Sequence, residues 1–203
     1  MKLPPLGPRQ WLVFAAVALL FFAWGAFLVR TPPPDEPLPW LAEWQVLVLE
    51  PLADERLRLA ELSVLVAGEL WLQPRPQGAR LLYRGEWLDA GVPWRLEAEL
   101  ALSETERSSL MAAAGLGAED AEQPLAAQLV AQLGGHGIVG LTLEPQDAVP
   151  AARLASSLGQ PRLRLQLDDG EAWVYPQLGL TAHADGERLR VLQAVPQRVL
   201  GSR

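Results

Sequence analysis

The sequence predicts an α+β protein, in which an N-terminal transmembrane helix precedes a mostly antiparallel β-sheet domain with two or three short helices inserted in the middle. Three observations support this class. Residues 11–29 form an uncharged apolar run, apolar residues alternate with polar ones in several segments after residue 40, and Asp, Gly or Pro separate these segments. With 203 residues, of which 50% are hydrophobic, the chain forms at most two small domains.

Residues 11–29 predict the membrane span. At 1.5 Å rise per residue a helix of this length extends roughly 28 Å, close to the ~30 Å hydrocarbon core of a bilayer. A helix satisfies its own backbone hydrogen bonds in lipid, where water is absent. We expect aromatic side chains of the run to contact lipid and its interface, as membrane-anchor residues: Trp11, Phe14, Phe21, Phe22, Trp24 and Phe27.

The flanking charges predict the orientation of this helix. Lys2 and Arg9 precede the run without any acid, whereas Arg30 is soon followed by Asp35 and Glu36. The positive-inside bias therefore places residues 1–10 in the cytoplasm and exports the rest, which predicts a single-pass inner-membrane protein with a periplasmic domain. A cleaved signal peptide ending near 23–25 is the alternative, and it predicts the same compartment without the anchor.

A proline-rich spacer, residues 30–39, follows the apolar run. It contains five prolines, which lock φ and disfavour helix in the preceding residue. We expect a short, stiff connection to a periplasmic α+β domain over residues 40–196, followed by a C-terminal tail over 197–203.

Alternation predicts the strands of this domain. In residues 94–102 every second residue is apolar, while Arg95, Glu97 and Glu99 lie on the opposite phase, as in a half-buried strand. Further strands are expected at 44–49, 57–66, 70–72, 81–87, 138–143, 162–167 and 187–191. Turn residues at 73–78, 89–91, 168–170 and 184–186 predict hairpin loops between strands.

Residues 103–159 break this alternation and predict the helices. Ser103 and Glu106 have the spacing of a capping box for a first helix. Pro124 is expected at the start of a second helix, whose apolar stripe comprises Leu125, Leu129, Val130 and Leu133. Asp147 is expected to cap a third helix over about 149–158, which ends at Gly159.

Few residues suggest catalysis. The chain has no Cys and two His, and neither His136 nor His183 has metal-ligand spacing. We interpret residues 134–137 as a helix end and turn, His183 as a strand end, and the acid pairs at 104–106, 119–122 and 168–169 as capping or solvated residues. No nucleophile elbow occurs. We therefore expect no enzyme activity, catalytic residue, cofactor or metal.

Charge and aromatic residues bear on the partners. After residue 30 the chain has 14 basic and 24 acidic residues, about −10 in net charge, which disfavours nucleic acid. Most tryptophans follow the apolar phase of strands and are expected in the core. Trp40 and Trp44, directly after the spacer, are candidates for contact with a partner or the headgroup region.

These features together favour a non-catalytic adaptor. We expect a bitopic inner-membrane protein whose periplasmic domain is a scaffold or adaptor subunit of a cell-envelope machine of secretion, pilus or transport type, an architectural analogy. Its partners would be other inner-membrane or periplasmic envelope proteins, and lipid through residues 11–29. The alternative is a tethered domain that binds lipid or another hydrophobic ligand in a groove of Leu-rich strand faces. An enzyme with a spatially assembled Ser or carboxylate site is a third hypothesis.

Overall fold

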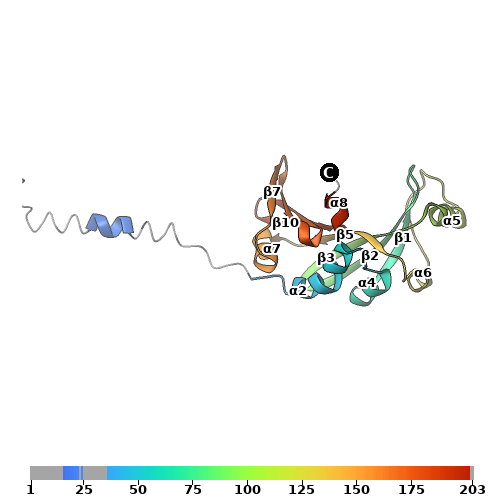
Figure 1. The fold of residues 1–203 in the computed structure, drawn as a ribbon, viewed down its shortest axis with the longest axis horizontal. Coiled ribbons are helices and arrows are strands. Elements are labelled where there is room, and N and C mark those ends of the chain that lie inside the picture. The colour runs from blue at the N-terminus through green and yellow to red at the C-terminus, as the bar shows by residue number, and fades with distance from the viewer. Residues whose placement is uncertain (1–15, 23, 25–35, 202–203) are drawn as a thin grey trace, which may run out of the picture. The chain divides into compact units, whose positions relative to one another are not determined.

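The computed structural model describes residues 16–22, 24 and 36–201, and the chain divides into two units, 1–35 and 36–203 (Figure 1). In the first unit residues 16–22 are helical, and Phe21, Phe22 and Trp24 are 70%, 81% and 63% exposed. No helix of the described residues has the length and apolar character needed to cross a membrane. The expected anchor residues Trp11, Phe14 and Phe27 lie outside the described residues, as does most of the run 11–29.

The second unit contains one antiparallel sheet, which confirms the predicted α+β class at this level. In the described residues its strand order is β4-β1-β2-β3-β5-β10-β9-β8-β7, and β6 pairs with β10. The strands are β1 (Gly68–Gln73), β2 (Arg80–Asp89), β3 (Val92–Leu100), β4 (Gln123–Pro124), β5 (Ile138–Pro145), β6 (Val149–Pro150), β7 (Leu163–Leu167), β8 (Gly170–Tyr175), β9 (Leu180–Asp185) and β10 (Arg188–Ala194).

Tight connections build the two halves of this sheet. β1, β2 and β3 are successive antiparallel neighbours, and so are β7, β8, β9 and β10. β5 lies between the halves and pairs with β3 on one side and β10 on the other. The turns predicted at 73–78, 89–91, 168–170 and 184–186 connect strands in these hairpins, which confirms them.

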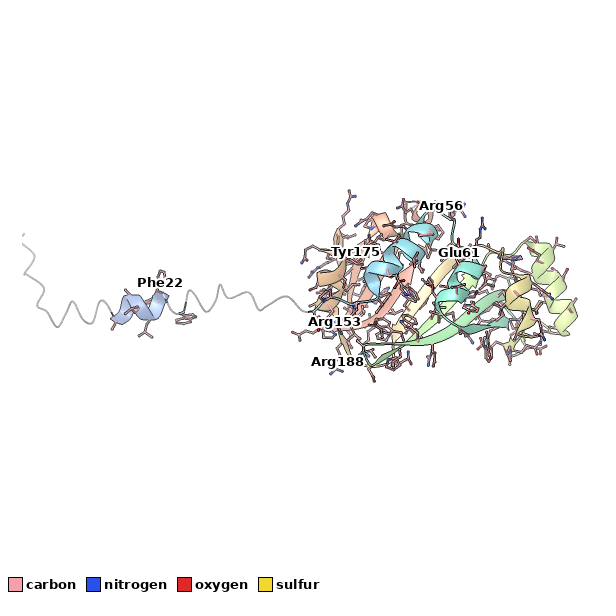
Figure 2. All side chains as sticks on the ribbon, turned by 90° about the horizontal axis from the view of Figure 1, so that it is seen from below. Phe22, Arg56, Glu61, Arg153, Tyr175 and Arg188 are labelled. Carbon is pink, nitrogen blue, oxygen red and sulfur yellow. The ribbon has the colours of Figure 1, made fainter. Side chains whose placement is uncertain are left out.

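The helices of residues 41–65, together with α7 (Ala151–Leu158), cover one face of the sheet. Figure 2 shows the helices of residues 41–65 lying across the strands, with Glu61 labelled on α4. Their buried residues join one core cluster with the apolar phase of the strands, such as Trp94, Leu96 and Ala98 of β3. The helices are α2 (Leu41–Trp44), η1 (Gln45–Leu49), α3 (Glu50–Ala53), α4 (Leu59–Leu65), α5 (Glu104–Ala114), α6 (Gln128–Gln132), α7 (Ala151–Leu158), η2 (Pro176–Leu178) and α8 (Gln197–Gly201).

Two predicted strands are helical in the structure, and those predictions are wrong. Residues 44–49 belong to α2 and the π-helical η1, and residues 59–65 form α4. The buried residues Leu41, Trp44, Val48 and Leu52 recur at helical spacing, whereas Val46 is 60% exposed. The pattern of these short apolar runs is therefore compatible with the two-residue period of a strand and with the 3.6-residue period of a helix. Packing against the sheet selects the helix.

The three predicted helices of the middle region exist with different boundaries. The capping box is confirmed, because the Ser103 hydroxyl accepts a hydrogen bond from Glu106 N and α5 follows. Pro124 does not start α6, since residues 123–124 pair with β1 and the helix begins at residue 128. Asp147 is not a cap either, because Pro150 occupies that position of α7.

Part of the expected C-terminal tail is helical. Residues 197–201, expected as a tail, form the short helix α8. Arg198 of this helix makes an ion pair of 2.9 Å with Glu55, which follows α3. The end of the chain therefore contacts the segment that connects the two N-terminal helical regions of the domain.

Candidate interaction surfaces

The sheet face opposite the helices carries a cluster of charged side chains, which we name the open-face ladder and define as Arg80, Arg84, Glu86, Arg95, Glu97, Glu99, Glu122 and Glu144. These residues lie on the polar phase of β2, β3 and β5, or directly before β4. Opposite charges alternate between adjacent strands, as in cross-strand ion pairs. The exposed fraction of these side chains ranges from 26% for Arg84 to 69% for Glu86, so a second molecule can reach them.

Arg84 is the centre of the ladder. Its Nε donates to Glu97 at 2.9 Å, and its two terminal nitrogens donate to both carboxylate oxygens of Glu122. Glu122 also accepts a 2.9 Å hydrogen bond from the Gln73 amide. The hydrogen bonds that Arg84 donates to Glu122 lower the pKa of Glu122. The same hydrogen bonds, followed by the one that Arg84 donates to Glu97, raise the pKa of Arg84 above its usual value, despite partial burial.

The remaining members of the ladder make separate pairs. Arg80 donates to Glu99 at 2.6 Å, a hydrogen bond that raises the pKa of Arg80. Arg95 lies 3.5 Å from Glu86 and 3.9 Å from Glu144, so its guanidinium is held more loosely than that of Arg84. A partner that offers a carboxylate can therefore compete for Arg95 at a lower cost than for Arg84.

A shallow depression of about 380 Å³ opens on this face, lined by Arg84, Arg95, Glu97, Thr142 and Glu144. Its lining contains two guanidiniums, two carboxylates and one hydroxyl, so its formal charge is balanced. Such a surface offers directional donors and acceptors to a polar partner.

A second exposed feature is the edge strand β7. In the described part of the chain this strand pairs only with β8, and all five of its residues are exposed. Leu163, Leu165 and Leu167 are 49%, 45% and 38% exposed. On the opposite face of the strand, the Arg164 guanidinium lies 4.4 Å from the centroid of the Trp173 ring.

The structure places Trp40 and Trp44 in the core of the domain. They are 7% and 6% exposed and form a cluster with Trp87 and Trp94, in which Trp44 stacks on Trp87 at 4.7 Å and Trp40 meets Trp94 edge-on at 5.0 Å. The domain's own atoms therefore cover most of their surface. Packing explains these residues, and contact with a partner or with headgroups stays a prediction that burial does not favour.

The histidines and acid pairs are dispersed. His136 lies in the turn between α6 and β5, as predicted, where its Nε2 is 3.0 Å from Glu106 and its Nδ1 is 3.1 Å from the Leu133 carbonyl. His183 lies on β9, and residues 168–169 form the β7–β8 turn. Within residues 16–22, 24 and 36–201, no group of three or more His, Asp or Glu side chains could hold a metal ion.

Sequence reasoning did not find the open-face ladder as a unit. It placed Arg95, Glu97 and Glu99 on the polar phase of one strand, and the structure confirms that phase. Their partners on β2 and β5, and Glu122 before β4, come from other parts of the chain. The only sequence signal was the alternating charge itself, which does not specify the neighbouring strand.

No family model, curated protein or solved structure matches this chain. The function proposed below therefore rests on the surfaces described above.

Proposed function

We propose that this protein is a non-catalytic, single-pass inner-membrane protein whose exported domain is a scaffold or adaptor subunit of a cell-envelope machine of secretion, pilus or transport type. Its partners are other inner-membrane or periplasmic envelope proteins, while residues 11–29 contact lipid. The apolar run and the charges around it support the membrane location. The open-face ladder supports the binding role.

The observation that carries the proposal is the polar sheet face. The helices pack against the other face of the sheet, so the ladder and its depression are available to a partner. Arg84 is held by Glu97 and Glu122, which orders its charge before any partner arrives. A surface whose side chains are already ordered loses less conformational entropy on binding.

The charge state of Glu122 supports binding in preference to proton transfer. The ion pair with Arg84 keeps Glu122 ionised well below neutral pH, because its pKa is lowered. A carboxylate of this kind accepts hydrogen bonds from a partner's donors throughout the physiological range, but it is a poor general acid there.

The lipid-binding alternative has less support. It required Leu-rich strand faces that line a groove, and the leucines of β3 and β5 instead belong to the packed core, with Leu96, Leu141 and Leu143 at most 2% exposed. The exposed leucines of β7 form a single row on one edge strand and line none of the described pockets. The depression on the opposite face is lined by charged groups. We therefore do not propose a hydrophobic ligand.

Site-specific crosslinking in living cells tests the adaptor role. A photoreactive amino acid replaces Thr142, which lines the depression, and the matched control replaces Val64, which is 84% exposed on α4. We expect a defined envelope protein crosslinked from position 142 and not from position 64. A chain that gives no adduct at position 142, and that purifies alone from mild detergent, contradicts the adaptor role.

A fusion tests the location separately. A reporter at the C-terminus that is active only in the periplasm should be active, because the positive-inside bias exports the domain. A cytosolic reporter contradicts the proposed topology. A mature chain that begins near residue 25 and is washed from membranes contradicts the anchor.

A further inference from the structure

The edge strand β7 differs from the opposite edge of the sheet. β4, at the other end of the strand order, has only two residues and contains Pro124, which cannot donate a backbone hydrogen bond. β7 has five residues, no proline, and no partner strand on its outer side among the described residues. A long edge of this kind presents backbone N–H and C=O groups for pairing with another strand.

The side chains of β7 have an apolar and a polar face. Strand pairing places Leu165 beside Ala172 and Arg164 beside Trp173, and Trp173 belongs to the core cluster on the helix side. Leu163, Leu165 and Leu167 therefore project from the open side of the sheet, where each is more than one-third exposed. Three leucines in this row are an unusual surface for a strand that faces only water.

The order of residues along β7 is self-complementary. In an antiparallel pair of two β7 strands centred on Leu165, Leu163 lies opposite Leu167 of the second copy, and Leu165 lies opposite itself. In the same register Arg162 lies opposite Asp168, and both residues are exposed. Cross-strand apolar pairs and opposite charges both stabilise such a pairing.

We propose that two copies of this chain associate through antiparallel pairing of their β7 strands, centred on Leu165, to form a continuous sheet across a twofold axis. The contact is isologous, so it closes at two copies and removes the exposed edge from both. This inference goes beyond the proposed adaptor function and does not depend on it. A homodimer would present two open-face ladders.

The natural absence of cysteine allows a direct test of the register in the full-length chain, purified in mild detergent. The Leu165→Cys variant should be joined into a dimer by a short thiol-to-thiol crosslinker, because directly opposed residues have Cβ atoms about 4.5–5.5 Å apart, slightly more than the roughly 3.5–4.5 Å that a disulfide spans. Leu163→Cys alone should not, but a mixture of Leu163→Cys and Leu167→Cys chains should. Val64→Cys, on an exposed position of α4, measures random collision.

A charge substitution tests whether this contact holds the dimer together. Leu165→Lys places like charges opposite each other at the twofold axis and should weaken dimerisation by at least about fivefold, as measured by light scattering of the full-length protein over a concentration series. Leu165 is 45% exposed, so the fold should survive, with unchanged near-ultraviolet circular dichroism. Val64→Lys is the matched control and should leave the dimer unchanged.

Three results would each overturn the proposal. The first is that the wild-type chain stays monomeric over the whole concentration series. The second is that the Leu165→Lys chain dimerises as strongly as the wild type. The third is that the Leu165→Cys chain crosslinks no faster than the Val64→Cys chain. The second result would assign dimerisation to another part of the chain. None of them bears on whether position 142 contacts an envelope protein.

Discussion

Truncation of Trp44 separates a core role from an interface role for the tryptophans that follow the spacer. Trp44 is 6% exposed and stacks on Trp87. A buried Trp side chain removes about 200 Å² from water, which corresponds to about 5 kcal/mol at 25 cal/mol per Å². Measured truncations of buried aromatic residues to Ala cost about 3–5 kcal/mol. We therefore expect Trp44→Ala to lower the free energy of unfolding by about 4 kcal/mol.

Urea unfolding of the full-length protein in detergent, followed by far-ultraviolet circular dichroism, measures this change. With a denaturant slope of about 2 kcal/mol per M, the midpoint should fall by about 2 M. The matched control is Trp71→Ala, because Trp71 is only partly buried and its ring lies 5.2 Å from the Arg84 guanidinium. That substitution should cost about 1 kcal/mol. If Trp44→Ala leaves the midpoint unchanged and abolishes only a partner contact, the assignment of Trp44 to the core is wrong.

Two further predictions concern ionisation. Burial raises the pKa of both tyrosines of the chain, that of Tyr175 to about 12, so the folded protein should show less than half of its full tyrosinate absorbance at pH 10. Full ionisation at that pH without unfolding would contradict the packing. The hydrogen bond from the Ser103 hydroxyl and then the one from His136 lower the pKa of Glu106 from 4.5 to about 2. Ionised Glu106 therefore stabilises the folded protein fully above pH 4.5, and this stabilisation is lost as the pH falls to about 2. Ser103→Ala should raise the pKa of Glu106, as measured by carboxyl NMR titration, and should lower the free energy of unfolding by about 1 kcal/mol at pH 7. If the titration of Glu106 is unchanged, the capping box is not the cause of its low pKa.

Local patterns predicted most of the sheet. The alternation in residues 94–102 and the turn residues at 89–91 and 168–170 concern neighbours in sequence, and the structure confirms β3 and both hairpins. Residues 44–49 were predicted as a strand and are helical, because their apolar residues fit the period of a strand and that of a helix. The choice between strand and helix there depended on the sheet surface against which Trp44 and Val48 pack.

The candidate surfaces were less predictable than the strands. Arg84 and Glu122 are 38 residues apart, and their contact exists only because β4 returns to pair with β1. The alternation of residues 162–167 predicted a half-buried strand, but the structure exposes every residue of β7. Strand order, which alternation does not encode, decides which strand forms the edge.

By itself the sequence determined six of the described strands, β1, β2, β3, β5, β7 and β10, together with the hairpin turns, the first helix cap and the apolar run that predicts the membrane anchor. Each of these depends on residues close together in the chain. The tertiary structure decided that residues 41–53 and 59–65 are helical, that Trp40 and Trp44 are buried, which charges form the open-face ladder, and that β7 is an edge. The reason is that burial and pairing depend on contacts between distant segments, and a local period of apolar residues specifies only which side chains are available for them.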